Sequence, residues 1–274
     1  MSGMLSRRTW LIGALVSLAI SAPSGAFAQA PDYEAIVAAP DRTDGDRQAD
    51  QRRQPAKMLA FAGVQTGMKV LDMEASAGYS TELLARAVGP TGTVYAQDSA
   101  AVIERFVKDK FDNRAQKPEM KNVVHVVRNF DDPIPPEIGN LDLITFFFAY
   151  DDMTYMPVDR AEMNRKMFAA LKPGGSLVIA DHAAKPGDGA NVGKTLHRIE
   201  ESTLRQEIEA AGILEVAAMM NHPFGHGRTV VRCSFFVVRK NRNACPTRSL
   251  CGFAANSELH LLLRTTENEH RTTY

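Results

Sequence analysis

Acidic residues stand where apolar stretches of this sequence end. Asp72 lies near the end of "KVLDM", Asp98 closes "GTVYAQD", and Asp181 closes "SLVIAD". The segment "EASAG" follows the first stretch and leads into a helical pattern. Carboxylates in such positions can accept hydrogen bonds from ligand hydroxyls or pair with a cation. A loop of small residues lets backbone N–H groups approach a ligand closely. The pattern therefore indicates a site for a nucleotide-like cofactor.

The loop itself departs from the usual glycine-rich pattern. Only Gly78 is retained, and Glu74 and Ser76 stand where other glycines are common. Ser76 is small and permits close approach if its φ angle is negative. Glu74 either repels a carboxylate of the ligand or pairs with an amino group, and the sequence leaves both alternatives open.

Strand-like and helix-like stretches alternate along the chain and must position these side chains. The expected strands are 69–73, 92–98, 122–129, 142–148, 176–181 and 234–240, and the expected helices are 55–63, 81–89, 99–111, a stretch capped by Asp159, and 203–212. This alternation predicts a doubly wound α/β fold, with a mostly parallel sheet and helices on both faces. Ligands of such sheets bind beyond the carboxyl ends of the strands. The residues expected there are Asp72, Asp98, Asn129, Tyr150, Asp151, Asp181 and His182.

The chain divides into four segments with different compositions. Residues 1–28 are read as a signal peptide, 29–54 as a polar lead-in with a solvated helix, 55–242 as the α/β domain, and 243–274 as a tail without clear periodicity. Across the 274 residues, 32 Lys and Arg balance 32 Asp and Glu, so the net charge is zero. This balance gives no electrostatic reason to expect nucleic acid as a partner, and we expect a small-molecule substrate instead.

The first segment has the layout of a secretory signal. Arg7 and Arg8 precede an apolar run, and Ala26-Phe27-Ala28 resembles a cleavage site. The run is too short to span a bilayer comfortably, so we expect no membrane span after the signal is removed. The paired arginines favour the twin-arginine route, with the general secretory route as the alternative. We expect a periplasmic or secreted protein.

The three cysteines, Cys233, Cys245 and Cys251, all lie late in the chain. An oxidising compartment permits one disulfide among them and leaves one thiol over. The favoured interpretation is that none of the three cysteines has a functional role.

Several motifs together resemble the class I S-adenosylmethionine-dependent methyltransferases. "DMEASAG" resembles the first motif of that family, "VYAQD" the acid that closes strand two, and "LKPGGSLVIAD" the stretch through strand five. More narrowly, "YDDMTYMPVDRAEMNRKMFAALKPGG" and "DHAAKPGDGANVGKTLHRIE" resemble a group of secreted predicted methyltransferases. The resemblance covers Pro55 to Lys240 and implies a Rossmann-like, seven-stranded sheet that binds S-adenosylmethionine.

The resemblance also implies roles for individual residues. Asp98 would accept hydrogen bonds from both ribose hydroxyls, and Asp72 would orient the amino end of the cofactor. Asn129 would read the adenine amino group. The loop residues Glu74, Ser76 and Gly78 would surround the methionine part.

A general base is needed only where the methyl acceptor must lose a proton. We expect Tyr150, Asp151 and His182 to serve the reaction. Asp152 and His197 are further candidates, although Asp151 and Asp152 could equally form a solvated turn, and His197 is expected to be a structural or lid residue. Asp151, Asp181 and His182 show no metal-ligand spacing, so no metal is expected.

Three functions follow from this reading. The first is methyl transfer from S-adenosylmethionine to an unidentified small molecule, and the second is a binding or scaffold protein that keeps the fold without catalysis. The third, a nicotinamide oxidoreductase, is disfavoured because "EASAG" does not fit the dinucleotide fingerprint. The sequence does not identify the acceptor or the oligomeric state.

Overall fold

The computed structural model describes residues 30–107, 109–211, 216–224 and 231–240. The predicted signal peptide and the predicted tail lie outside the described residues, as do Cys245 and Cys251. Among the described residues, none of the helices has the length and apolar character needed to cross a membrane.

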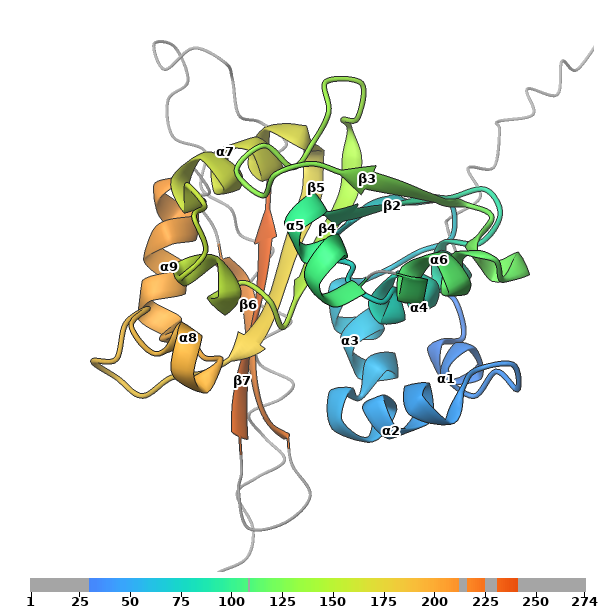
Figure 1. Cartoon of the computed structure of the whole chain (residues 1–274), viewed down its shortest axis with the longest axis horizontal. Helices are drawn as coiled ribbons and strands as arrows, with labels where there is room; N and C mark the ends of the chain where they lie inside the picture. The colour runs from blue at the N-terminus through green and yellow to red at the C-terminus, as the bar shows by residue number, and fades with distance from the viewer. Residues whose placement is uncertain (1–29, 108, 212–215, 225–230, 241–274) are drawn as a thin grey trace, which may run out of the picture.

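A seven-stranded sheet forms the centre of the domain (Figure 1). Its strands are β1 (Lys69–Met73), β2 (Thr93–Asp98), β3 (Val123–Val127), β4 (Leu141–Phe147), β5 (Leu171–His182), β6 (Val216–Phe224) and β7 (Val231–Arg239). They lie in the order β3-β2-β1-β4-β5-β7-β6. Strands β1 to β5 pair in parallel, whereas β7 runs antiparallel to both β5 and β6. The predicted doubly wound, mostly parallel sheet is confirmed, although the sequence patterns missed β6.

Helices cover both faces of this sheet. They are α1 (Tyr33–Val37), α2 (Asp44–Arg53), α3 (Pro55–Ala62), α4 (Tyr79–Val88), α5 (Ala100–Val102), α6 (Asp109–Ala115), α7 (Arg160–Ala170), α8 (Gly193–Leu196) and α9 (Glu201–Ala210). The first six gather on one side of the sheet, and α7, α8 and α9 lie on the other (Figure 1). The strand order reverses between β1 and β4, so the crevice expected for a ligand lies at their carboxyl ends.

The apolar patterns read from the sequence form the core. Strand β4, which matches the expected strand 142–148, is buried along nearly its whole length. On α4, Leu83, Leu84, Ala87 and Val88 are all buried against the sheet. The predicted cap of α7 is present, because the side chain of Asp159 accepts a hydrogen bond from the backbone N–H of Glu162 at 2.9 Å.

The helix predicted over 99–111 is interrupted. A π-helical turn, η1 (Ile103–Val107), separates α5 from the position where α6 begins. Because a π turn is wider than an α turn, it rotates the residues that follow it. Val107 and Phe111 thereby face the core, while Phe106 is 60% exposed.

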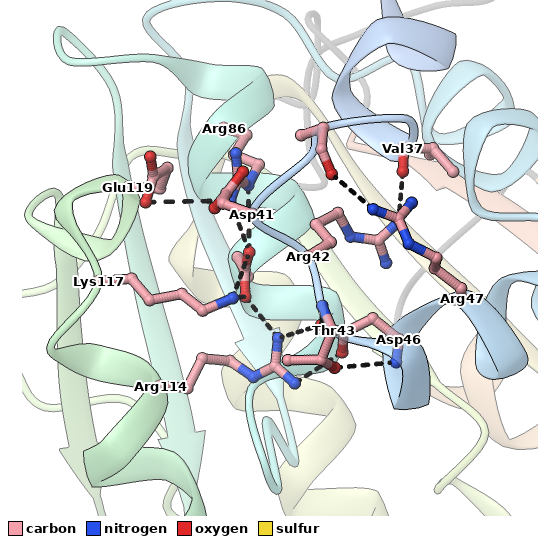
Figure 2. Close-up of polar contacts among 12 residues, drawn as sticks. Val37, Asp41, Arg42, Thr43, Asp46, Arg47, Arg86, Arg114, Lys117 and Glu119 are labelled. Carbon is pink, nitrogen blue, oxygen red and sulfur yellow. Dashed lines mark hydrogen bonds and ion pairs between the residues drawn. The ribbon is translucent and has the colours of Figure 1, made fainter.

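The polar lead-in is bound to the domain by ion pairs (Figure 2). Asp46, in the first turn of α2, is 3% exposed and pairs with Arg114 of α6 at 2.7 Å. Arg42 pairs with Asp50 of α2 at 2.6 Å. The prediction of a solvated helix is wrong for this face of α2, because its charged side chains meet partners far along the chain.

Candidate functional site

The loop after β1 has an unusual backbone conformation. Glu74 (φ 51°) and Ser76 (φ 54°) both adopt the left-handed region, as does Gly78 (φ 77°). For residues with a Cβ atom this region costs about 1–2 kcal/mol each. The negative φ angle on which close approach at Ser76 depended is therefore absent.

Gly78 serves the packing of this loop. It is the N-cap of α4, and a Cβ atom there would lie 2.9 Å from Cδ of Arg114 and 3.2 Å from the ring of Phe111. The guanidinium of Arg114 donates to the carbonyl oxygen of Ala77 at 2.9 Å. The retained glycine is thus explained by the contact between the loop and α6.

The carboxylate of Asp72 is buried and accepts hydrogen bonds from three hydroxyl groups. Its carboxylate accepts hydrogen bonds from Ser80 and Thr81 of α4 at 2.8 and 2.7 Å, and from Thr145 of β4 at 2.8 Å. Burial raises the pKa of Asp72 to about 6, although the hydroxyl donors oppose the shift. Asp72 therefore joins β1 to α4 and β4, and it holds the base of the loop in place.

Asp98 joins the loop to the next strands. Its Oδ1 accepts from the backbone N–H of Ser76 at 3.0 Å, and its Oδ2 lies 3.3 Å from Nε2 of His125 on β3. His125, which the sequence analysis did not select, also stacks on Phe111 with ring centroids 4.1 Å apart. Each carboxylate oxygen offers two lone pairs, so Asp98 retains acceptor capacity for the ribose hydroxyls predicted from the family resemblance.

Glu74 carries a buried carboxylate oxygen, Oε2, without a hydrogen-bond partner among the described residues. Burial, and then the nearby charges of Asp152, Asp98 and Asp151, raise the pKa of Glu74 to about 9. Such a group is either protonated or compensated by a cation. A positively charged part of a ligand, such as the ammonium or sulfonium of S-adenosylmethionine, fits this requirement.

A second acidic group lies at the carboxyl ends of β4 and β5. Asp181 accepts hydrogen bonds from the backbone N–H groups of Asp151 at 2.9 Å and of His182 at 2.7 Å. His197 lies at the C-terminal end of α8. Its Nδ1 is 3.5 Å from Oδ2 of Asp151 and 3.1 Å from Oδ1 of Asp152. Burial, followed by the charge of Asp152, raises the pKa of Asp151 to about 6.

The structure brings together only some of the predicted site residues. Tyr150 is fully buried beneath α7 and α9, where its hydroxyl donates to Glu207 and accepts from Asn164. The side chain of Tyr150 therefore packs between these helices and does not join the acidic group at the carboxyl ends of β4 and β5. His182 lies with its ring 5.3 Å from that of Phe148, and Asn129 is exposed just beyond β3.

Helix α2 contributes residues that sequence reasoning missed. The guanidinium of Arg53 lies 5.1 Å from the ring centroids of both Tyr79 and Phe148, and burial lowers its pKa. The hydroxyl of Tyr79 donates to Asp50 of the same helix at 2.6 Å. No sequence pattern indicated these contacts, because they join segments that lie far apart along the chain.

Comparisons with known proteins agree with this architecture. The model of the ubiE/COQ5 methyltransferase family matches residues 49–186, just over half of the chain. A ubiquinone/menaquinone biosynthesis C-methyltransferase UbiE from Cupriavidus taiwanensis is 32% identical over 124 residues, which cover 45% of this chain and 46% of that protein. The corresponding protein of Pseudomonas aeruginosa is 28% identical over 123 residues, 45% of each chain. The chain thus matches about half the length of these curated relatives.

Solved structures show the same fold at low sequence identity. A SAM dependent methyltransferase from Aquifex aeolicus superimposes with a TM-score of 0.51 at 20% identity, covering 72% of this chain and 99% of that one. Phosphoethanolamine N-methyltransferase 2 from Haemonchus contortus, in complex with S-adenosyl-L-methionine, gives 0.51 at 14% identity, covering 69% and 52%. The matched family model spans the altered loop, the acid that closes β2, and all of β5, and by this match the chain belongs to the ubiE/COQ5 methyltransferase family.

Proposed function

We propose that this protein transfers a methyl group from S-adenosylmethionine to a small-molecule acceptor. The observation that carries the proposal is the buried, unpaired carboxylate oxygen of Glu74 among other acids at the carboxyl edge of the sheet. S-adenosylmethionine brings positive charge to such a place, whereas the pyrophosphate of a nicotinamide dinucleotide would bring negative charge. The charge of the site therefore favours the methyltransferase over the oxidoreductase.

Each side chain then has a part in holding the cofactor. Glu74 pairs with the ammonium group, Asp98 accepts from the ribose, and Asn129 is available to the adenine. Asp72 acts through the hydroxyls of α4 and keeps the loop in position. When bound, S-adenosylmethionine supplies an electrophilic methyl group, and the protein contributes chiefly by orienting the acceptor in line with it.

The acceptor side lies at the ends of β4 and β5, where Asp151 and His182 border the cluster. The UbiE relatives are named as C-methyltransferases of quinone biosynthesis. We propose an acceptor of small-molecule size for this chain. A carboxylate or imidazole at this edge suits an acceptor that must release a proton.

Titration calorimetry with S-adenosylmethionine, S-adenosylhomocysteine and NAD tests the proposal. We expect the protein to bind the first two and not the third. Asp98→Ala removes a charged acceptor from the ribose and should weaken S-adenosylhomocysteine binding by about 1.5–3 kcal/mol, roughly ten- to a hundredfold. If the wild type does not bind and Glu74→Gly restores no binding, the methyltransferase proposal is wrong. Cofactor binding without methyl transfer to any acceptor would favour the binding or scaffold protein.

A further inference from the structure

Three potential metal ligands converge beside the loop that follows β1. The ligand atoms of Asp151, Asp152 and His197 all lie within 4.8 Å of one another. Nδ1 of His197 is 3.1 Å from Oδ1 of Asp152 and 3.5 Å from Oδ2 of Asp151. Adjacent ligands on one octahedral cation with bonds of about 2.1 Å are separated by about 3 Å. The two distances from His197 are near this spacing, and small side-chain rotations would bring all three ligands onto a single divalent cation.

A buried oxygen in this group has no donor. Asp151 is 2% exposed, and its Oδ2, the atom that faces His197, has no hydrogen-bond partner in the part of the chain that the structure describes. A buried carboxylate oxygen left without a donor is costly, and a cation bound between the ligands would remove that cost. The charges of Asp152 and Asp151 also act on Glu74, whose Oε2 is unpaired, so the acidic group extends to the loop after β1.

The position of His197 is fixed by close backbone packing. Helix α8 lies on η3 (Asp151–Thr154), and a Cβ atom at Gly193 would approach the carbonyl oxygen of Asp151 to 2.7 Å. Only glycine permits this approach. His197 ends α8 with a φ angle of 48°, and its N–H donates to the carbonyl oxygen of Gly193 at 2.9 Å. The fold thus fixes the backbone of His197 beside the two carboxylates at the cost of a left-handed residue, while the side chain itself is 63% exposed.

One further contact orients the second carboxylate. The hydroxyl of Tyr155 donates to Oδ1 of Asp152, and the ring of Tyr155 lies edge-on to that of His197. Outer partners of this kind commonly fix metal ligands in place.

We propose that Asp151, Asp152 and His197 form a binding site for a divalent cation of the Mn²⁺ type. Two carboxylates and one imidazole suit such an ion, and three protein ligands leave coordination positions open. These positions suit an oxygen atom of the bound small molecule, so the site favours acceptors that carry a hydroxyl or carboxylate. The binding of the ion itself does not depend on methyl transfer and can be measured without cofactor.

Titration of the protein with Mn²⁺, followed by electron paramagnetic resonance of the free ion, tests the site. Mn²⁺ is the appropriate probe because it avoids the cysteine thiolates that softer metals prefer. We expect one site per chain in the wild type. His197→Asn, which tolerates the left-handed backbone, and Asp152→Asn should each weaken binding by about tenfold or more. Asp188→Asn, which changes an acid of the same loop region outside the cluster, should leave the affinity unchanged.

Melting temperatures without metal show whether the variants are folded. Added Mn²⁺ should raise the melting temperature of the wild type and of Asp188→Asn, but not of the two cluster variants. No Mn²⁺ binding by the folded wild type would overturn the proposal. Binding that survives both cluster substitutions would overturn it as well. Either outcome is independent of S-adenosylhomocysteine binding, which tests the proposed function separately.

Discussion

Glu74 is the residue at which this loop differs most in chemistry from a glycine-rich one. With its pKa raised to about 9 by burial and neighbouring acids, the side chain is protonated at pH 7. Pairing with the ammonium of a ligand favours the carboxylate, so binding should release about one proton. Calorimetric titration with S-adenosylhomocysteine at pH 7, in buffers of different ionisation enthalpy, measures that proton directly.

Two variants separate the charge of Glu74 from the strain of the loop. Glu74→Gln keeps a left-handed residue but removes the carboxylate, so proton release should disappear and affinity should fall. Ser76→Gly relieves strain at a neighbouring left-handed position without changing charge, and proton release should persist. A wild-type binding enthalpy that is the same in every buffer would contradict the pairing of Glu74 with the ammonium.

Residue types and strand-end positions predicted much of the site, but not its contacts. Asp98 and Asp151 do lie at the expected edge, because parallel strands bring their carboxyl ends together. Tyr150 occupies the same position in sequence, yet its side chain points between α7 and α9. A strand end fixes where a residue lies, whereas the direction of its side chain depends on partners that periodicity does not reveal. His197 joins the cluster only through the approach of α8 to η3.

At the scale of elements, Arg114 connects α2, the loop after β1 and α4. It pairs with Asp46 at 2.7 Å, donates to the carbonyl oxygen of Ala77 at 2.9 Å, and forms a short contact with Glu82. Although burial opposes the shift, hydrogen bonds from Arg114 and Thr43 lower the pKa of Asp46 to about 2. The stability that Asp46 contributes is therefore present above its unfolded pKa, near 3.8, and is lost as the pH falls through about 2.

Asp46→Asn should consequently destabilise the attachment of α2. Loss of charged hydrogen bonds predicts a cost of about 1.5–3 kcal/mol in urea unfolding at pH 7. The difference from the wild type should shrink as the pH falls toward 2. Hydrogen exchange should show faster exchange in α2 and in the loop at Ala77. Asp44→Asn changes an exposed acid in the same first turn, and an equal effect there would contradict a specific role for the pair with Arg114.

Alternation and capping signals predicted most elements, while long-range pairing decided the exceptions. The lead-in was expected to be solvated because a run of charges is usually exposed. Its partner Arg114 lies 68 residues from Asp46, beyond the reach of any local pattern. The break in the helix over 99–111 has the same origin, since the π turn serves to bury Val107 and Phe111 against the sheet.

At the scale of the whole molecule, we propose that the protein is exported and acts outside the cytosol. The paired Arg7 and Arg8, the apolar run and Ala26-Phe27-Ala28 motivate this proposal. Such a location separates the enzyme from the cytosolic source of S-adenosylmethionine. Export in the folded state, as the twin-arginine route allows, would permit the cofactor to be loaded before translocation.

Cell fractionation and N-terminal sequencing test this proposal. The exported protein should begin at Gln29, because cleavage is expected after Ala28. Replacing Arg7 and Arg8 together by Lys should retain uncleaved protein in the cytosol if the twin-arginine route operates, since the positive charge is kept and only the arginine pair is lost. Unchanged export of this variant would indicate the general secretory route. Recovery of the wild type only as a full-length cytosolic chain would show that these residues are not an export signal, and the question of how cofactor reaches the enzyme would then disappear.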